Sequence, residues 1–179
     1  MSARWSVDAP VYLVGFMAAG KTTAGRELAE RLGWEFADTD ALVERELGKP
    51  IEAIFRESGE GVFREAEWNA LRSLDGRSRL VVATGGGLYL GVVHRAFIRA
   101  RGVSCWLDVP LSLVIARAGD TSSRPLLASD DALLRRSFFE RRRAAYALAD
   151  VRIDASRGSP EEVAAVIADR RRRFYIDFF

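Results

Sequence analysis

The stretch Gly15-Phe-Met-Ala-Ala-Gly-Lys-Thr22 constrains this chain more than any other part of its sequence. It matches the pattern G-x-x-x-x-G-K-[ST], it follows the apolar run Val11-Tyr-Leu-Val-Gly15, and it opens a segment in which apolar residues recur at helical spacing. A buried strand, a glycine-rich turn and a helix N-terminus in this order form a loop whose backbone N–H groups can surround phosphate oxygens. The sequence therefore predicts a P-loop nucleotide-binding fold, against the alternative of an ordinary strand-to-helix turn.

The loop contains the side chains that a bound nucleotide needs. Lys21 is one of only two lysines in a chain whose basic residues are otherwise arginines. Its ammonium group can reach the β- and γ-phosphates, and the Thr22 hydroxyl can ligate Mg²⁺. The loop residues that we expect to bind the nucleotide are Ala18, Ala19, Gly20, Lys21, Thr22 and Thr23.

Short apolar runs alternate with segments of helical periodicity along most of the chain. Continuous apolar strands are typical of a parallel sheet that crossover helices cover on both faces. The sequence therefore predicts a single α/β domain over residues 1–179, P-loop NTPase-like, with about five parallel strands flanked by helices. The expected strands are 11–15, 34–38, 80–84, 103–108 and 151–154, and the expected helices are 21–32, 40–47, 50–58, 61–74, 91–100, 111–118, 130–149 and 160 onward.

Composition narrows the class of protein. Of the 179 residues, 49% are hydrophobic and 29% are charged, which excludes a disordered, collagen-like or disulfide-stapled protein. Cys105 is the single cysteine, so a reducing cytoplasm fits best. Charged residues interrupt every apolar run well short of the roughly 20 residues of a membrane span. With a net charge of only +2, we expect a cytoplasmic monomer with small-molecule ligands and neither a nucleic-acid nor a membrane partner.

The carboxyl ends of the other strands carry groups that could hold a second substrate, because ligands of parallel sheets bind there. Asp38-Thr-Asp40 ends the second strand, and its carboxylates could serve a metal shell and an acceptor hydroxyl, or could cap the next helix. Gly85-Gly-Gly87 follows the third strand, either as a plain turn or as a backbone that approaches a ligand closely. Arg64 lies in a predicted helix, where the alternative to a ligand contact is a solvated pair with Glu60 or Glu67.

Six stretches of the sequence together resemble the shikimate kinase family. They are the P-loop, Asp38-Thr-Asp40, Gly59-Glu-Gly-Val-Phe-Arg64, Ala83-Thr-Gly-Gly-Gly87, Ser123-Arg-Pro-Leu-Leu127 and Arg142-Arg-Ala-Ala-Tyr146. They occur in the order of the family and at close to its spacing, from about residue 11 to residue 160. Six motifs in one order are much more specific than a P-loop alone.

The resemblance implies transfer of the γ-phosphoryl group of ATP to the 3-hydroxyl of shikimate, a step toward chorismate and the aromatic amino acids, with Mg²⁺ bound. It implies the catalytic residues Lys21, Asp40 and Arg124, with Thr22 and Asp38 at the metal ion. Arg117 would lie beside adenine, and Arg124 would belong to a mobile lid at about residues 112–128. The implied shikimate contacts are Asp40, Arg64, Gly85, Gly86, Gly87 and Arg142, and both arginines would clamp the substrate carboxylate.

The sequence also departs from the family pattern. Ala18 stands where the family usually has glycine, and its methyl group could constrain the loop or lower nucleotide affinity. The run Arg141-Arg-Arg143 leaves either Arg142 or Arg143 as the second clamp residue. The tail 174–179 has no counterpart, and we expect it to pack on the domain or on a neighbouring subunit. Alternative functions are another small-metabolite P-loop kinase, such as a gluconate kinase, or a shikimate-kinase-like binding protein that has lost catalysis.

Overall fold

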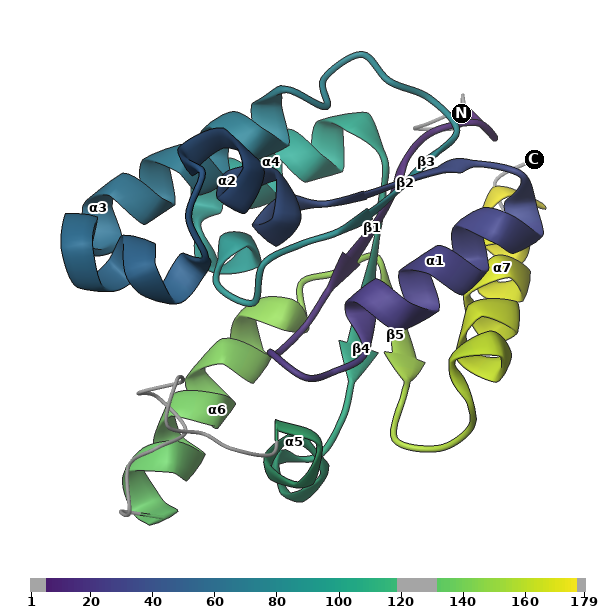
Figure 1. The fold of residues 1–179 in the computed structure, drawn as a ribbon. Coiled ribbons are helices and arrows are strands. Elements are labelled where there is room, and N and C mark those ends of the chain that lie inside the picture. Colours follow the sequence, from purple (N-terminus) through teal and green to yellow (C-terminus); the bar gives the residue numbers. More distant parts are fainter. Residues whose placement is uncertain (1–5, 119–131, 177–179) are drawn as a thin grey trace.

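A five-stranded parallel sheet with the strand order β2-β3-β1-β4-β5 lies at the centre of the molecule (Figure 1). The computed structural model describes residues 6–118 and 132–176, with side chains up to residue 172. Every residue of β1, β3 and β4 is buried, as expected for apolar strands covered on both faces. The predicted α/β class is confirmed, and each strand begins and ends within one residue of its predicted bounds. The strands are β1 (Val11–Val14), β2 (Glu35–Asp38), β3 (Leu80–Ala83), β4 (Val103–Asp108) and β5 (Val151–Asp154).

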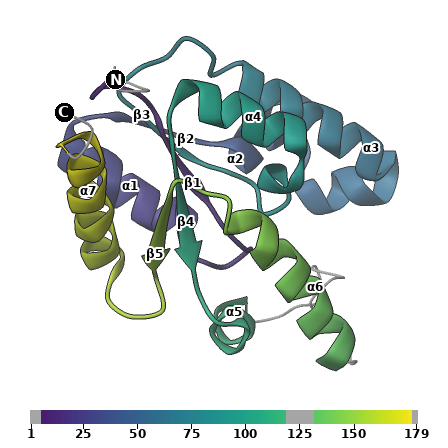
Figure 2. The ribbon, with the colours of Figure 1, turned by 180° about the vertical axis from the view of Figure 1, so that it is seen from behind.

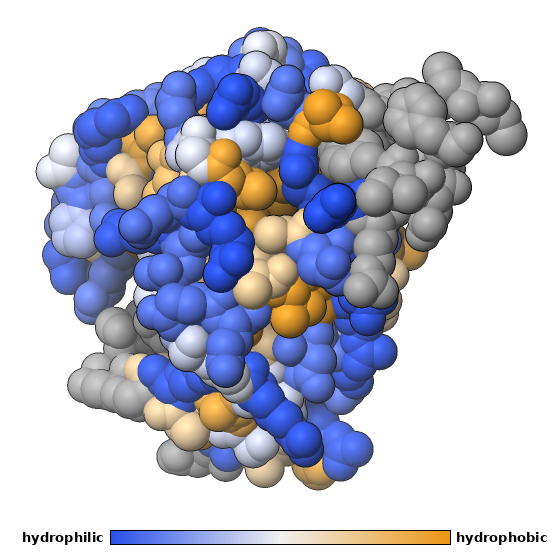
Figure 3. Space-filling model, turned by 90° about the vertical axis from the view of Figure 1, so that its right-hand side faces the viewer, coloured by the Kyte–Doolittle hydropathy of each residue, from blue (hydrophilic) through white to orange (hydrophobic). Residues whose placement is uncertain are grey.

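Helices connect the strands and cover both faces of the sheet. α1 and α7 pack together on one face (Figure 1), and α4 and α6 cover the opposite face (Figure 2). Seen from the side of α7, the surface is mostly hydrophilic (Figure 3), which matches the polar outer face of an amphipathic helix. Within the described part of the chain these elements are α1 (Lys21–Leu32), α2 (Thr39–Leu47), α3 (Ile51–Arg72), the 3₁₀ turn η1 (Leu88–Leu90), α4 (Val92–Arg101), α5 (Leu111–Ala118), α6 (Ala132–Tyr146) and α7 (Pro160–Ile176).

The helix bounds differ from the prediction in two places. The sequence predicted separate helices at 50–58 and 61–74, whereas α3 runs from Ile51 to Arg72 with a kink at Gly59. Gly59 has φ 81° and ψ 171°, a backbone conformation that glycine adopts without steric cost, so the break occupies one residue. α6 ends at Tyr146 rather than at residue 149, because the chain turns there and the amides of Leu148 and Ala149 bond the carbonyls of Ala145 and Tyr146.

A small second core holds α2 and α3 together beside the sheet. Its buried residues are Val43 from α2 and Ile54, Phe63, Ala66 and Ala70 from α3. This core holds α3 against α2, so the side chains on the same face of α3 as Phe63 and Ala66 have fixed positions beside the sheet.

Two expectations from the sequence reach beyond what the structure describes. Most of the predicted lid at 112–128 lies outside the described residues, and its first residues form part of α5. In the tail, residues 177–179 and the side chains from residue 173 onward also lie outside them. Among the helices that are described, none combines the length and the apolar character of a membrane span.

Candidate active site

The loop between β1 and α1 bends through three residues with positive φ, namely Gly15 (142°), Ala18 (58°) and Gly20 (91°). Only glycine fits at position 15, because a Cβ there would lie 2.8 Å from the Leu107 carbonyl oxygen. The Lys21 side chain is buried, and its Nζ donates hydrogen bonds to the carbonyl oxygens of Gly15 at 2.9 Å and Phe16 at 2.7 Å. The loop thus curls around the lysine ammonium group, which is the arrangement expected of a phosphate-binding loop.

The remaining predicted loop residues lie on the same turn. Ala19 is buried, and the Thr23 hydroxyl donates to the Gly20 carbonyl at 3.0 Å. Ala18 has a left-handed backbone conformation, which costs an L-residue about 1 kcal/mol relative to glycine. The departure from the family pattern therefore falls at a position where glycine would be unstrained.

Residues at the end of β2 form hydrogen bonds both to the start of α1 and to the turn after β3. The Thr22 hydroxyl donates to Asp38 Oδ2 at 2.7 Å, and Asp38 Oδ1 accepts from the Asp40 amide at 3.0 Å, so Asp38 also caps α2. The Thr39 hydroxyl accepts from the buried Gly85 amide at 2.8 Å. The capping role and the proposed metal role of Asp38 are compatible, because its two oxygens make different contacts.

The oxygen atoms of Thr22 and Asp38 fit Mg²⁺, which prefers hard oxygen ligands and is usually bound by one or two protein groups together with substrate phosphates. Among the described residues, no group of three or more His, Cys, Asp or Glu side chains could hold an ion by itself. A magnesium ion at this place would therefore complete its shell with phosphate oxygens and water.

Two carboxylates, each with a buried oxygen, meet at Gly85, just after β3. A Cβ on Gly85 would lie 2.5 Å from both Asp40 Oδ1 and Glu67 Oε1. Neither oxygen has a hydrogen-bond partner within the described structure. Since buried polar atoms are normally paired, two acceptors left open at one point indicate a place where a ligand hydroxyl can donate.

Burial also changes the proton affinity of these carboxylates. It raises the pKa of Asp40 from its ordinary value of 3.8 to about 6, and the negative charge of Asp38 raises it further while Lys21 opposes the shift. Burial likewise raises the pKa of Glu67, although its contact with Arg64 acts in the opposite direction. A carboxyl group with a pKa of about 6 can exchange a proton near neutral pH.

Arg64 and Arg142 approach the glycine triplet from different helices. A Cβ on Gly87 would lie 2.5 Å from Arg64 Nη1, which donates to Glu67 Oε2 at 2.8 Å. The buried Arg142 donates from Nη1 to the Gly86 carbonyl at 3.2 Å. Within the described structure no carboxylate forms an ion pair with Arg142, and its Nε has no partner. The Glu67 carboxylate lies close enough to interact with this charge but does not pair with it directly, so the guanidinium is suited to an anionic ligand.

The structure distinguishes Arg142 from its neighbour on α6. Arg143 faces away from the glycine triplet, and its guanidinium pairs with Asp108 at 2.9 Å. Arg117 is exposed on α5, and its Nη2 lies 3.4 Å from the Ala155 carbonyl oxygen, beside the loop that follows β5. Arg124 lies outside the described residues. These positions favour Arg142 over Arg143 as the second clamp residue.

Sequence reasoning underestimated Glu67. It was considered only as a solvated partner of Arg64, yet the structure shows its side chain 1% exposed. The pattern contained a signal, because Glu67 lies four residues after Phe63 and three before Ala70, two apolar residues of the second core. A charged residue on the apolar face of a helix is seldom solvated.

Comparisons with known proteins show the family to which this chain belongs. The shikimate kinase family model matches residues 17–171. A shikimate kinase of Persephonella marina is 41% identical over 162 residues, which cover 90% of this chain and 98% of that protein.

Solved structures separate two levels of similarity. A shikimate kinase from Acinetobacter baumannii in complex with shikimate has a TM-score of 0.84 and 38% identity, and the match covers 90% of this chain and 92% of that chain. A gluconokinase from Sinorhizobium meliloti 1021 is 20% identical with a TM-score of 0.59 over 96% of this chain and 98% of that chain, so it shares the fold alone. Because both the family model and close relatives match most of its length, this chain belongs to the shikimate kinase family of ATP-dependent kinases.

Proposed function

We propose that this protein transfers the γ-phosphoryl group of ATP to the 3-hydroxyl of shikimate. The observation that carries the proposal is the convergence of Arg64 and Arg142 on Gly86 and Gly87, next to the open oxygen of Asp40. Two arginines from different helices suit a carboxylate, and a buried acceptor beside them suits a hydroxyl on the same small molecule. Shikimate carries both groups on one ring.

The nucleotide would bind along the loop from Ala18 to Thr23. Lys21 would neutralise charge on the phosphates from its position inside the loop. Thr22 and Asp38 would hold Mg²⁺, which when bound supplies further positive charge to the phosphate oxygens. Arg117 would lie beside adenine, and Arg124 would reach the phosphates from the lid.

At the acceptor end, the chain supplies a proton acceptor and orientation. Asp40 would accept a hydrogen bond from the 3-hydroxyl and then its proton, while a bond forms between that oxygen and the γ-phosphorus and the bond to the leaving ADP oxygen breaks. Gly85, Gly86 and Gly87 leave room for the ring to approach the backbone. Phosphoryl transfer depends mainly on such positioning and on charge neutralisation.

The alternative of a binding protein without catalytic activity is less well supported. Lys21, Thr22, Asp38 and Asp40 are all present, and hydrogen bonds within the loop and at the end of β2 hold them in place. The substitution at Ala18 adds local strain without removing a functional group. The proposal also includes a monomeric enzyme in the cytoplasm, with small molecules as its partners.

A coupled ADP-release assay with shikimate, quinate, gluconate and no acceptor tests the proposal. We expect release of ADP with shikimate well above that with the other acceptors, and loss of this activity in Lys21→Ala. Preference for gluconate would favour the alternative kinase, and ADP release that is independent of the acceptor would sink the proposed function.

A further inference from the structure

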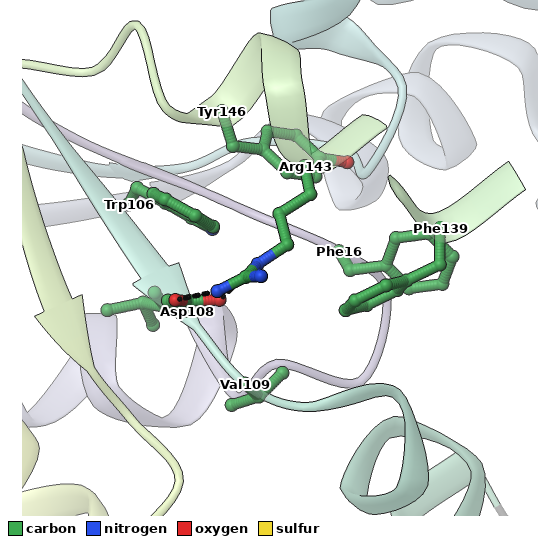
Figure 4. A pocket seen from close by; sticks show the side chains of 8 residues that line it. Phe16, Trp106, Asp108, Val109, Phe139, Arg143 and Tyr146 are labelled. Atoms are coloured by element: carbon green, nitrogen blue, oxygen red, sulfur yellow. Dashed lines mark hydrogen bonds and ion pairs between the residues drawn. The ribbon is translucent and has the colours of Figure 1, made fainter. Parts of the chain in front are cut away.

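The last turns of α6 are held by contacts on two different sides of the helix. Arg142 and Tyr146, one turn apart, both donate to the Gly86 carbonyl oxygen. Arg143 instead extends toward β4, where its Nη2 donates to Asp108 Oδ2 at 2.9 Å and its Nε to Oδ1 at 3.3 Å (Figure 4). Neighbouring helical residues project about 100° apart, so the two sets of contacts together fix the rotation of α6 about its axis.

Holding Arg142 in this orientation costs desolvation free energy. Arg142 is only 8% exposed, and its Nε has no partner among the described residues. Burial lowers the pKa of its guanidinium, as does the nearby charge of Arg64, while Tyr146 and Glu67 oppose that shift. Its charged group lies 4.2 Å from the ring centre of Phe138 and 5.6 Å from that of Phe16, which offsets part of the desolvation. Before substrate binds, rotation of α6 would return this cation to water. The burial of Phe139 and Tyr146 in the core opposes that rotation, and a contact on the other side of α6 would oppose it further.

Asp108 supplies that contact from a fixed position. It is the last residue of β4, its side chain is 9% exposed, and β4 is buried along its whole length between β1 and β5. Figure 4 shows the Arg143 side chain descending from α6 to Asp108 beside Trp106. The guanidinium lies 5.6 Å from the Trp106 ring centre, which limits where it can move.

Arg152 provides an internal comparison. It shares the same carboxylate, with its Nε 2.9 Å from Asp108 Oδ2, and its guanidinium also lies over Trp106. It belongs to β5, however, and its side chain is 64% exposed. Replacing Arg152 with a neutral residue therefore removes one cationic partner of Asp108 but leaves the contact that holds α6.

We propose that Asp108 is a positioning residue for the substrate clamp: through its ion pair with Arg143, it fixes the rotation of α6 that keeps Arg142 at Gly86. The inference rests on the proposed function, because it assigns to Arg142 the carboxylate of shikimate. Asp108 acts through another residue and is not itself catalytic.

Steady-state kinetics of Asp108→Asn, Arg143→Gln and Arg152→Gln test the proposal. We expect the first two variants to raise the KM for shikimate about tenfold, with kcat and the KM for ATP changed less than about twofold, because only the clamp geometry is disturbed. The double variant Asp108→Asn/Arg143→Gln should be no worse than either single one, since both remove the same contact. Asp108→Glu should recover part of the loss, and Arg152→Gln should keep the KM of the wild type.

Three results would overturn the inference. They are an unchanged shikimate KM in Arg143→Gln, an equal rise in both KM values in Asp108→Asn, and an Arg152→Gln variant that is as impaired as Arg143→Gln. Hydrogen exchange of residues 139–146 without substrate provides a second readout that does not depend on the acceptor. Exchange should be faster than in the wild type in Asp108→Asn and Arg143→Gln and unchanged in Arg152→Gln. The same exchange rate in all three variants would count against the anchoring role of Asp108. If the wild type does not phosphorylate shikimate, the proposed function fails, whereas the exchange experiment still decides whether Asp108 fixes α6.

Discussion

Replacing Asp40 by asparagine is expected to abolish activity and, at the same time, to stabilise the protein at neutral pH. The carboxyl group of Asp40 has one buried oxygen that no described residue contacts by a hydrogen bond, and burial raises its pKa in the folded protein from 3.8 to about 6. The folded state therefore binds a proton on Asp40 more tightly than the unfolded state does. Keeping Asp40 ionised in the fold is unfavourable, and asparagine removes that cost.

The magnitude and the pH range follow from the shift. One pKa unit corresponds to about 1.4 kcal/mol, so a shift of about two units gives an upper limit near 3 kcal/mol. Residual solvent contact reduces this to about 2 kcal/mol, or a rise in Tm of about 4 to 8 °C for a domain of this size. The stabilising effect of the raised pKa is complete below the unfolded value of 3.8 and is lost as the pH rises through about 6. The advantage of Asp40→Asn should thus be small near pH 4, grow between pH 4 and 6, and stay constant above about pH 7.

The assay is thermal unfolding of the wild type and the variant from pH 4 to 8, with a chelator and without nucleotide. Asp75→Asn serves as the control, because the Arg101 side chain lowers the pKa of Asp75. That variant should be less stable than the wild type at pH 7, and the difference should stay nearly constant down to pH 4, because it is lost only as the pH falls below 3.8 through the lowered pKa of Asp75. A difference between Asp40→Asn and the wild type that is independent of pH, or a variant less stable at pH 7 than at pH 4 relative to the wild type, would refute the reasoning.

Three further predictions concern the two binding sites. Lys21→Ala should abolish phosphoryl transfer with an unchanged far-UV circular dichroism spectrum, because the ammonium group neutralises phosphate charge; turnover near the wild-type rate would disprove this role. Arg64→Ala and Arg142→Ala should each raise the KM for shikimate about ten- to a hundredfold and leave that for ATP nearly unchanged, since a charge-assisted contact contributes about 1.5 to 3 kcal/mol. If Arg143→Ala raises the KM for shikimate more than Arg142→Ala does, with kcat unchanged, the assignment of the clamp to Arg142 is wrong. Ala18→Gly should raise Tm by about 1 to 3 °C, because relief of the left-handed strain exceeds the entropy that glycine adds to the unfolded chain; a lower Tm would show that Ala18 is not strained.

Much of the sheet could be predicted because its signals are local. Val11–Val14 and Leu80–Ala83 are short apolar runs that end in glycine or in Thr84-Gly85, and they form buried strands at the predicted places. The break at Gly59 was placed correctly, but local sequence does not show whether two helical segments separate or only kink. η1 was missed, since a single turn closed by Gly85 and Gly87 carbonyls has no periodicity to detect.

The candidate site was harder to predict, because its contacts join residues far apart in the chain. The chemistry of Thr22 and Asp38 could be read from their motifs, whereas the hydrogen bond between them depends on how β2 meets α1. No local pattern pairs Asp108 with Arg143, which lies 35 residues further along the chain on another element. This pair distinguishes Arg143 from Arg142, a choice that the run of arginines left open.

The most direct test of the central claim is to identify the product by ³¹P and ¹H NMR after incubation with ATP, Mg²⁺ and shikimate. The account predicts one new phosphate monoester whose phosphorus couples to the proton at C3 of the shikimate ring, formed in equal amount with ADP and absent with Lys21→Ala. Inorganic phosphate in place of the ester, or a phosphate on another hydroxyl of the ring, would contradict it.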